Sequence, residues 1–189
     1  MEASEDRTLA SAIVIPAPPP VAEFVAAFRR EHPGQESYAL PPHITVMWPF
    51  ISPGTLDDEP DEALLRQTAD RLRRICRLIA PFTVTLDRYG TFPGGVLYLA
   101  PRDPAPIIAL HSHILAQFPE YPPYGGEYGE LVPHMTLGIF APEDVSAIAG
   151  RLTLEPLAFV VDRLCFMYGD QRFSQPWKTA AVIPLGVGR

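Results

Sequence analysis

The chain has 189 residues, of which 47% are apolar and 10% aromatic, a composition that excludes an intrinsically disordered protein. Its length suits one domain, or two small lobes that share a core. The net charge of −7 and the pI near 5.2 argue against a protein that grips long duplex nucleic acid, because such proteins present a basic face to the phosphates.

The cysteines and the apolar runs bear on where the protein works. Cys76 and Cys165 lie far apart in apolar surroundings, so we expect two buried free thiols and no disulfide. No stretch reaches the roughly 18 apolar residues of a transmembrane helix. The acidic N-terminus, Met1 to Asp6, lacks the basic and apolar regions of a signal peptide. We therefore expect a cytoplasmic protein with no membrane partner.

In the first half of the chain, the apolar run at 10–15 predicts a buried strand, and the prolines at 18–20 lead into an amphipathic helix. Arg29 lies off the apolar stripe of that helix. A strand over 43–50 follows. The remaining elements predicted for this half are a helix over 61–79 and a strand over 82–86.

The second half repeats this order. It predicts a strand over 96–99, a helix over 104–118, a strand over 134–140, a helix over 142–152, and strands over 157–167 and 177–184. We therefore expect an internal duplication, with pseudo-repeats at about 10–92 and 96–185. The element order alone is also compatible with two independent ferredoxin-like units.

Two short segments stand out because they match each other. Pro42-His43-Ile44-Thr45-Val46 and Pro133-His134-Met135-Thr136-Leu137 both read Pro-His-apolar-Thr-apolar, with their histidines 91 positions apart. In a strand, alternate side chains share a face, so each His and its Thr lie together while the apolar residues anchor in a core. A histidine near its ordinary pKa of about 6.5 can act as a proton acceptor or donor at neutral pH. Two such units could supply an acid, a base and two hydroxyl donors.

This paired motif resembles that of the 2H phosphoesterase superfamily, which includes the bacterial 2′-5′ RNA ligase-like proteins and cyclic phosphodiesterases. The resemblance extends from about Ala10 to Leu185. It implies an α+β fold over residues 1–189, a single bilobal domain with two mainly antiparallel sheets facing across a cleft and helices outside. It also implies catalytic roles for His43 and His134, and phosphate binding by Thr45 and Thr136.

The implied reaction is hydrolysis or transesterification of a 2′,3′-cyclic or 2′-5′ phosphodiester on a small nucleotide or RNA terminus, and we expect it to need neither metal nor cofactor. We expect a monomer. By loop position, Phe92, Tyr124 and Tyr128 are candidates for stacking on a base or ribose. Trp48 is five residues after His43, on the opposite face of a regular strand, and is predicted to lie in the core.

Two other functions compete with this one. The first is a non-catalytic protein that binds nucleotides or phosphorylated metabolites in the same cleft. The second is a metal-dependent hydrolase that uses the histidines as ligands. The second is disfavoured because neither motif has a nearby Asp, Glu or further His. His111 and His113 are two apart on a predicted helix and do not share a face, so they are not expected to bind a metal together.

Overall fold

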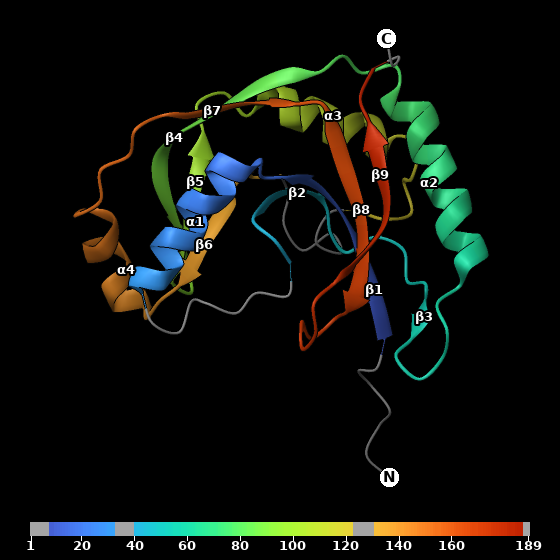
Figure 1. The fold of residues 1–189 in the computed structure, drawn as a ribbon, viewed down its shortest axis with the longest axis horizontal. Coiled ribbons are helices and arrows are strands. Elements are labelled where there is room, and N and C mark those ends of the chain that lie inside the picture. The colour runs from blue at the N-terminus through green and yellow to red at the C-terminus, as the bar shows by residue number, and fades with distance from the viewer. Residues whose placement is uncertain (1–7, 33–39, 123–130, 187–189) are drawn as a thin grey trace.

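Two antiparallel sheets organise the computed structural model, which describes residues 8–32, 40–122 and 131–186 (Figure 1). In the first sheet the strand order is β2 (His43–Met47), β1 (Thr8–Pro16), β8 (Arg163–Asp170), β9 (Lys178–Pro184), and the short β3 (Gly54–Thr55) also pairs with β1. In the second sheet the order is β6 (Met135–Ile139), β5 (Val96–Pro101), β4 (Phe82–Phe92), β7 (Leu157–Val161). The predicted α+β class with antiparallel sheets is confirmed.

The two halves of the chain exchange strands. β4 comes from the first half but pairs with β5 and β7 of the second, and β8 comes from the second half but pairs with β1. Two independent ferredoxin-like units are therefore excluded. The single strand predicted over 157–167 is also wrong: the chain leaves the second sheet at Val161 and enters the first at Arg163, so this apolar run is two strands.

The two motif strands occupy equivalent places. β2 and β6 are each the edge strand of a sheet, and they contact each other. Helix α1 (Pro19–Glu31) packs on β6, and α3 (Ala105–Leu115) packs on β2, so each of these helices covers the motif strand of the other half (Figure 1). Helix α2 (Glu62–Cys76) lies against β9, and α4 (Pro142–Ala149) lies against β4 and β5.

Local sequence explains where the helices begin and which face they bury. In α1, prolines occupy the first turn, where their missing N–H has no helical partner, and Val21, Val25 and Phe28 form the buried stripe. At the start of α2, the Asp61 carboxylate caps the helix by accepting from the Leu64 backbone N–H at 2.9 Å. No helix in the described ranges is long and apolar enough to cross a membrane.

One hydrophobic cluster continues from sheet to sheet. Ile13 of β1 and Phe166 of β8 are buried in the same cluster as Leu99 of β5 and Met135 of β6. A contiguous core fixes the two sheets relative to each other, and with them the two motif strands. Both cysteines are free thiols, as predicted, but only Cys76 is buried in this core, whereas Cys165 is partly buried.

Candidate functional site

Each motif strand contains a β-bulge at the same place. Between β1 and β2, Val14 lies opposite Thr45 and Ile13 lies opposite Met47, which leaves Val46 as an extra residue. A bulge of this kind sets two residues of one strand against one of the other and shifts the alternation of side chains.

The second motif strand repeats this geometry. Tyr98 of β5 lies opposite Thr136 and Leu97 lies opposite Gly138, which leaves Leu137 as the extra residue. Val46 and Leu137 each come three residues after the motif histidine. The two strands are thus related by structure as well as by sequence.

The bulges decide which side chains reach the cleft. Thr45 and Thr136 both line a cavity of about 400 Å³, together with His43. After each bulge the alternation is reset, so Trp48 and Ile139 also line this cavity. The prediction that Trp48 lies in the core is therefore wrong: Trp48 is only half-buried, because the extra residue Val46 returns it to the side of His43.

Both motif histidines are held in one orientation by the backbone. His43 Nδ1 lies 2.7 Å from the Pro41 carbonyl oxygen, and His134 Nδ1 lies 2.7 Å from the Val132 carbonyl oxygen. A carbonyl can only accept, so in both rings Nδ1 donates its hydrogen, and Nε2 is the nitrogen left to exchange a proton with a substrate. The matching partners, each two residues before the histidine, extend the equivalence of the two strands.

Burial lowers the pKa of both motif histidines, which favours their neutral form. Desolvation lowers the pKa of His43 below 6.5; the hydrogen bond to Pro41 partly opposes this, and the charges of His134 and Arg29 add to the lowering. Desolvation also lowers the pKa of His134, again opposed by its hydrogen bond to Val132. At neutral pH each free histidine is ready to accept a proton through Nε2.

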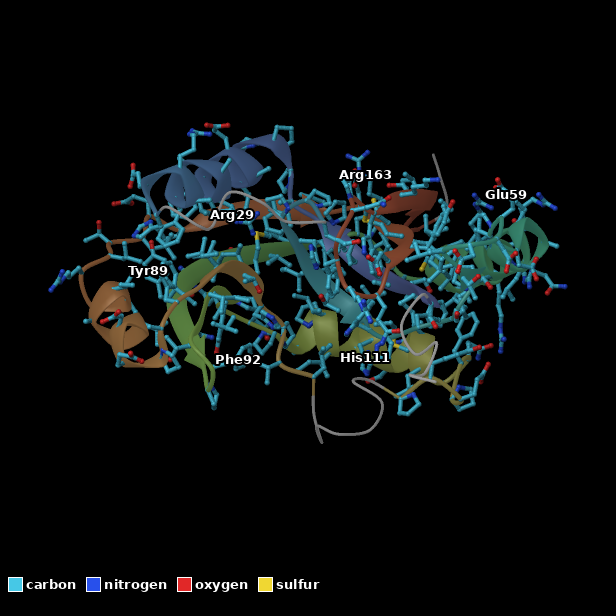
Figure 2. The ribbon with its side chains drawn as sticks, turned by 90° about the horizontal axis from the view of Figure 1, so that it is seen from below. Arg29, Glu59, Tyr89, Phe92, His111 and Arg163 are labelled. Carbon is cyan, nitrogen blue, oxygen red and sulfur yellow. The ribbon has the colours of Figure 1, made fainter. Side chains whose placement is uncertain are left out.

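Arg29 connects helix α1 to the second motif strand. Its Nε donates to the Leu137 carbonyl oxygen at 3.0 Å and its Nη2 donates to the Thr136 carbonyl oxygen at 3.0 Å. The residue is only 8% exposed and lines the cavity. Figure 2 labels it beside helix α1. The prediction that Arg29 lies off the apolar stripe of the helix is wrong. Arg29 follows Val21 by eight positions and Val25 by four, a spacing that belongs to the buried face and could have indicated this.

His111 mirrors this arrangement on the first motif strand. From α3, its Nδ1 lies 2.8 Å from the carbonyl oxygen of Val46, and the residue is buried (Figure 2). Each bulge carbonyl therefore accepts a hydrogen bond from a side chain on the helix that covers it. His113 is exposed and bonds to the Ala109 carbonyl oxygen. In the described part of the chain no group of three or more His, Cys, Asp or Glu is placed to hold a metal ion.

His134 lies against two aromatic rings. The Phe92 ring packs edge-on to it with centroids 4.8 Å apart, and the Tyr98 ring lies 5.3 Å away. Phe92 also stacks on Tyr98 at 4.4 Å. The structure thus brings Phe92 to a motif histidine, and Tyr98 is a neighbour that the sequence reasoning missed.

Not all predicted residues lie in the wall of the same cavity. His43, Thr45 and Thr136 form part of this wall, whereas His134 and Phe92 are not among its lining residues. Tyr124 and Tyr128 lie outside the described residues. Among the described residues that line the cavity, Arg29 carries a positive charge and none is a carboxylate, so this wall favours an anion within an acidic protein.

Comparisons with known proteins identify the family of this chain. The family model of the 2′-5′ RNA ligase superfamily matches residues 17–172. A protein of Geobacillus kaustophilus that bears a phosphoesterase name is 30% identical over 166 residues, which cover 82% of this chain and 86% of that protein.

Solved structures share the fold. E. coli LigT complexed with phosphate superposes with a TM-score of 0.62 at 18% identity, covering 96% of this chain and 99% of LigT. LigT complexed with 3′-AMP gives a TM-score of 0.61 at 20% identity, covering 95% and 98%. At these identities the likeness shows the fold alone, but the family match spans both motifs. The chain therefore belongs to the 2′-5′ RNA ligase superfamily of 2H phosphoesterases.

Proposed function

We propose that this phosphoesterase opens a 2′,3′-cyclic or 2′-5′ phosphodiester on a small nucleotide or an RNA terminus. His43 and His134 serve as general acid and base, and Thr45 and Thr136 hold the phosphate. The observation that carries this proposal is the duplicated geometry of the two histidines, each with Nδ1 bonded to the carbonyl two residues earlier and Nε2 left for proton transfer.

The chemistry needs one proton accepted and one donated. In hydrolysis of a cyclic phosphate, one neutral imidazole takes a proton from water as the water oxygen bonds to phosphorus. The bond from phosphorus to one ribose oxygen breaks, and the other, protonated imidazole gives that oxygen its proton. Each such transfer accelerates a reaction by about 10²–10⁴-fold.

Two hydroxyls and a guanidinium support the charge that develops on the phosphate. Thr45 and Thr136 line the cavity from opposite motif strands and can donate to the nonbridging oxygens. Arg29 lies in the same wall and adds a positive potential without leaving its two backbone partners. These residues bind the anion and stabilise its extra charge at the moment of attack.

The volume of the cavity and the net charge of the protein favour a small substrate. The cavity of about 400 Å³ suits a nucleotide or the end of an oligonucleotide, and the net charge of −7 disfavours a long duplex. LigT, with the same fold, is known in complex with phosphate and with 3′-AMP. A ligand of this kind fits the proposal for this chain.

The test is product formation from a panel of substrates in the presence of a chelator. The panel contains 2′,3′-cyclic nucleotides, ADP-ribose 1″,2″-cyclic phosphate, 2′-5′-linked oligoadenylate and an RNA that ends in a cyclic phosphate. The native protein should turn over at least one of them, and the His43→Ala, His134→Ala double variant none. Tight binding without turnover would show a non-catalytic nucleotide-binding protein, and activity lost only in chelator would show a metal-dependent enzyme.

A further inference from the structure

Three aromatic side chains outside the two motifs cluster in the wall of the cavity. Trp48, Phe173 and Trp177 all line it. The ring centroids of Trp48 and Trp177 are 5.3 Å apart and those of Trp48 and Phe173 are 5.4 Å apart. Phe173 stacks nearly parallel on Trp177, at 5.4 Å and 10°. We propose that these three residues, here called the aromatic triad, form the subsite for the substrate's nucleobase, an inference that rests on the proposed function.

The turn between β8 and β9 is built to present the ring of Phe173. The buried Asp170 accepts from the backbone N–H groups of Arg172 and Ser174 and from the Ser174 hydroxyl, and its backbone carbonyl accepts from the N–H of Phe173 and from the Trp177 indole N–H. Phe173 has a φ of 58°, in the left-handed region that bulky residues rarely adopt.

Phe173 nevertheless keeps 47% of its surface exposed. A strained backbone that leaves a large ring half in water is costly for stability alone.

Gly169 allows close packing within the aromatic triad. A Cβ built at Gly169 would lie 2.5 Å from the Trp177 ring, so only glycine lets that indole pack against β8. Trp177 is thereby held as a buried platform, 6% exposed, on which Phe173 rests. The exposed ring therefore has a fixed support.

The aromatic triad shares its cavity with the proposed catalytic groups, and this indicates which ligand it binds. Trp48 follows Thr45 by three residues and comes directly after the end of β2, and both line the cavity with His43. A nucleotide whose phosphate lies between the motif threonines would place its base elsewhere in the same cavity, whose wall includes the triad. Flat heterocycles gain affinity by stacking on aromatic rings, largely without regard to base identity. The triad thus predicts a preference for a nucleoside phosphate over a phosphate that lacks a base.

The two tryptophans of the chain, Trp48 and Trp177, are both in the triad, so intrinsic fluorescence reports on this subsite directly. Binding of 3′-AMP to the native protein should quench this fluorescence in a saturable way. Inorganic phosphate, followed by calorimetry, should bind without comparable quenching.

The variant that tests the subsite is Phe173→Asn, because Asn tolerates the left-handed backbone but lacks the ring. Its affinity for 3′-AMP should fall between about 5-fold and 150-fold, the loss expected for one stacked base, while its affinity for inorganic phosphate changes less than twofold. The matched control is Leu78→Asn, an exposed apolar residue outside this cavity, which should change neither affinity.

The outcomes separate this inference from the proposed function. Unchanged affinity of Phe173→Asn for 3′-AMP, equal losses for both probes, or no quenching in the native protein would overturn the subsite, even if cyclic phosphates are turned over. In that case the Phe92–Tyr98 pair beside His134 becomes the place to seek the base. Quenching that depends on Phe173, in a protein that turns over no phosphodiester, would support the subsite and refute the proposed catalysis.

Discussion

Replacing Arg29 by methionine should strongly lower the free energy of unfolding. Arg29 lies on α1, in the first half of the chain, and its hydrogen bonds hold β6, the motif strand of the second half. Methionine retains most of the apolar stem and removes the guanidinium. The two hydrogen bonds to the carbonyl groups of Thr136 and Leu137 are lost, and each bond from a charged donor contributes about 1.5–3 kcal/mol. The expected loss in the free energy of unfolding is about 3–5 kcal/mol, because the bulge carbonyl is then left in the core without this donor.

Urea denaturation of the native and variant proteins measures this loss. The neighbouring Arg30 supplies the matched control: it is exposed and pairs with Glu23 at 2.7 Å, so Arg30→Met should cost no more than about 1 kcal/mol. If Arg29→Met were as stable as Arg30→Met, the conclusion that Arg29 fixes the second motif strand would be refuted. Arg29→Met should also raise the pKa of His43 toward its ordinary value, because a nearby positive charge is removed.

Three further predictions concern the site and the turn beside it. The pH dependence of kcat/KM should be bell-shaped with its alkaline limb below pH 6.5, because both histidine pKa values are lowered in the free enzyme and the acid therefore loses its proton early; a flat profile from pH 5 to 9, with chemistry limiting, would contradict paired proton transfer. Thr45→Val and Thr136→Val should each lower kcat/KM by about 10²–10³-fold in steady-state assays, and a loss of less than threefold in both would remove them as phosphate donors. Asp170→Asn should destabilise the protein at neutral pH in thermal melts. Hydrogen bonds from the Ser174 hydroxyl and the Arg172 N–H lower the pKa of Asp170, so its stabilising effect is present above 3.8 and disappears as the pH falls through the lower folded value; a pH-independent difference would contradict this.

The motifs and most elements could be predicted from the sequence because they depend on local patterns. Apolar runs located β1 and β5, helical spacing located α1 and α2, and the repeated Pro-His-apolar-Thr-apolar segment located both motif strands. The His43 and Thr45 pair shares a cleft-facing side because simple alternation holds up to the bulge.

The bulges account for what the sequence could not show. Nothing local marks Val46 or Leu137 as an extra residue, since a bulge is defined by pairing with another strand. Simple alternation of side chains along the strand therefore gave the wrong side for Trp48, and the aromatic triad could not be predicted. Phe173 and Trp177 reach the cavity through the turn between β8 and β9, far from both motifs in sequence.

The exchange of strands between the two halves could not be predicted from the sequence for a similar reason. Which sheet a strand joins depends on contacts over long sequence separations, so β4 and β8 could not be placed from their own residues. Each sheet begins with a motif strand at its edge, continues with the strand that precedes it in its own half, and is completed by two further strands, at least one of which comes from the other half. We propose on this basis that residues 1–189 form one bilobal unit with pseudo-repeats at about 10–92 and 96–185. Deletion of either repeat should then leave an unfolded chain by circular dichroism.

The measurement that decides most about this chain is kcat/KM for a 2′,3′-cyclic nucleotide, in chelator, with the two motif histidines replaced one at a time. His43→Gln and His134→Gln should each lose about 10²-fold or more, because each removes one proton transfer. His113→Gln, an exposed change on α3, should match the native protein. Loss of less than tenfold in either motif variant, with the fold intact, would contradict a reaction in which both histidines move protons.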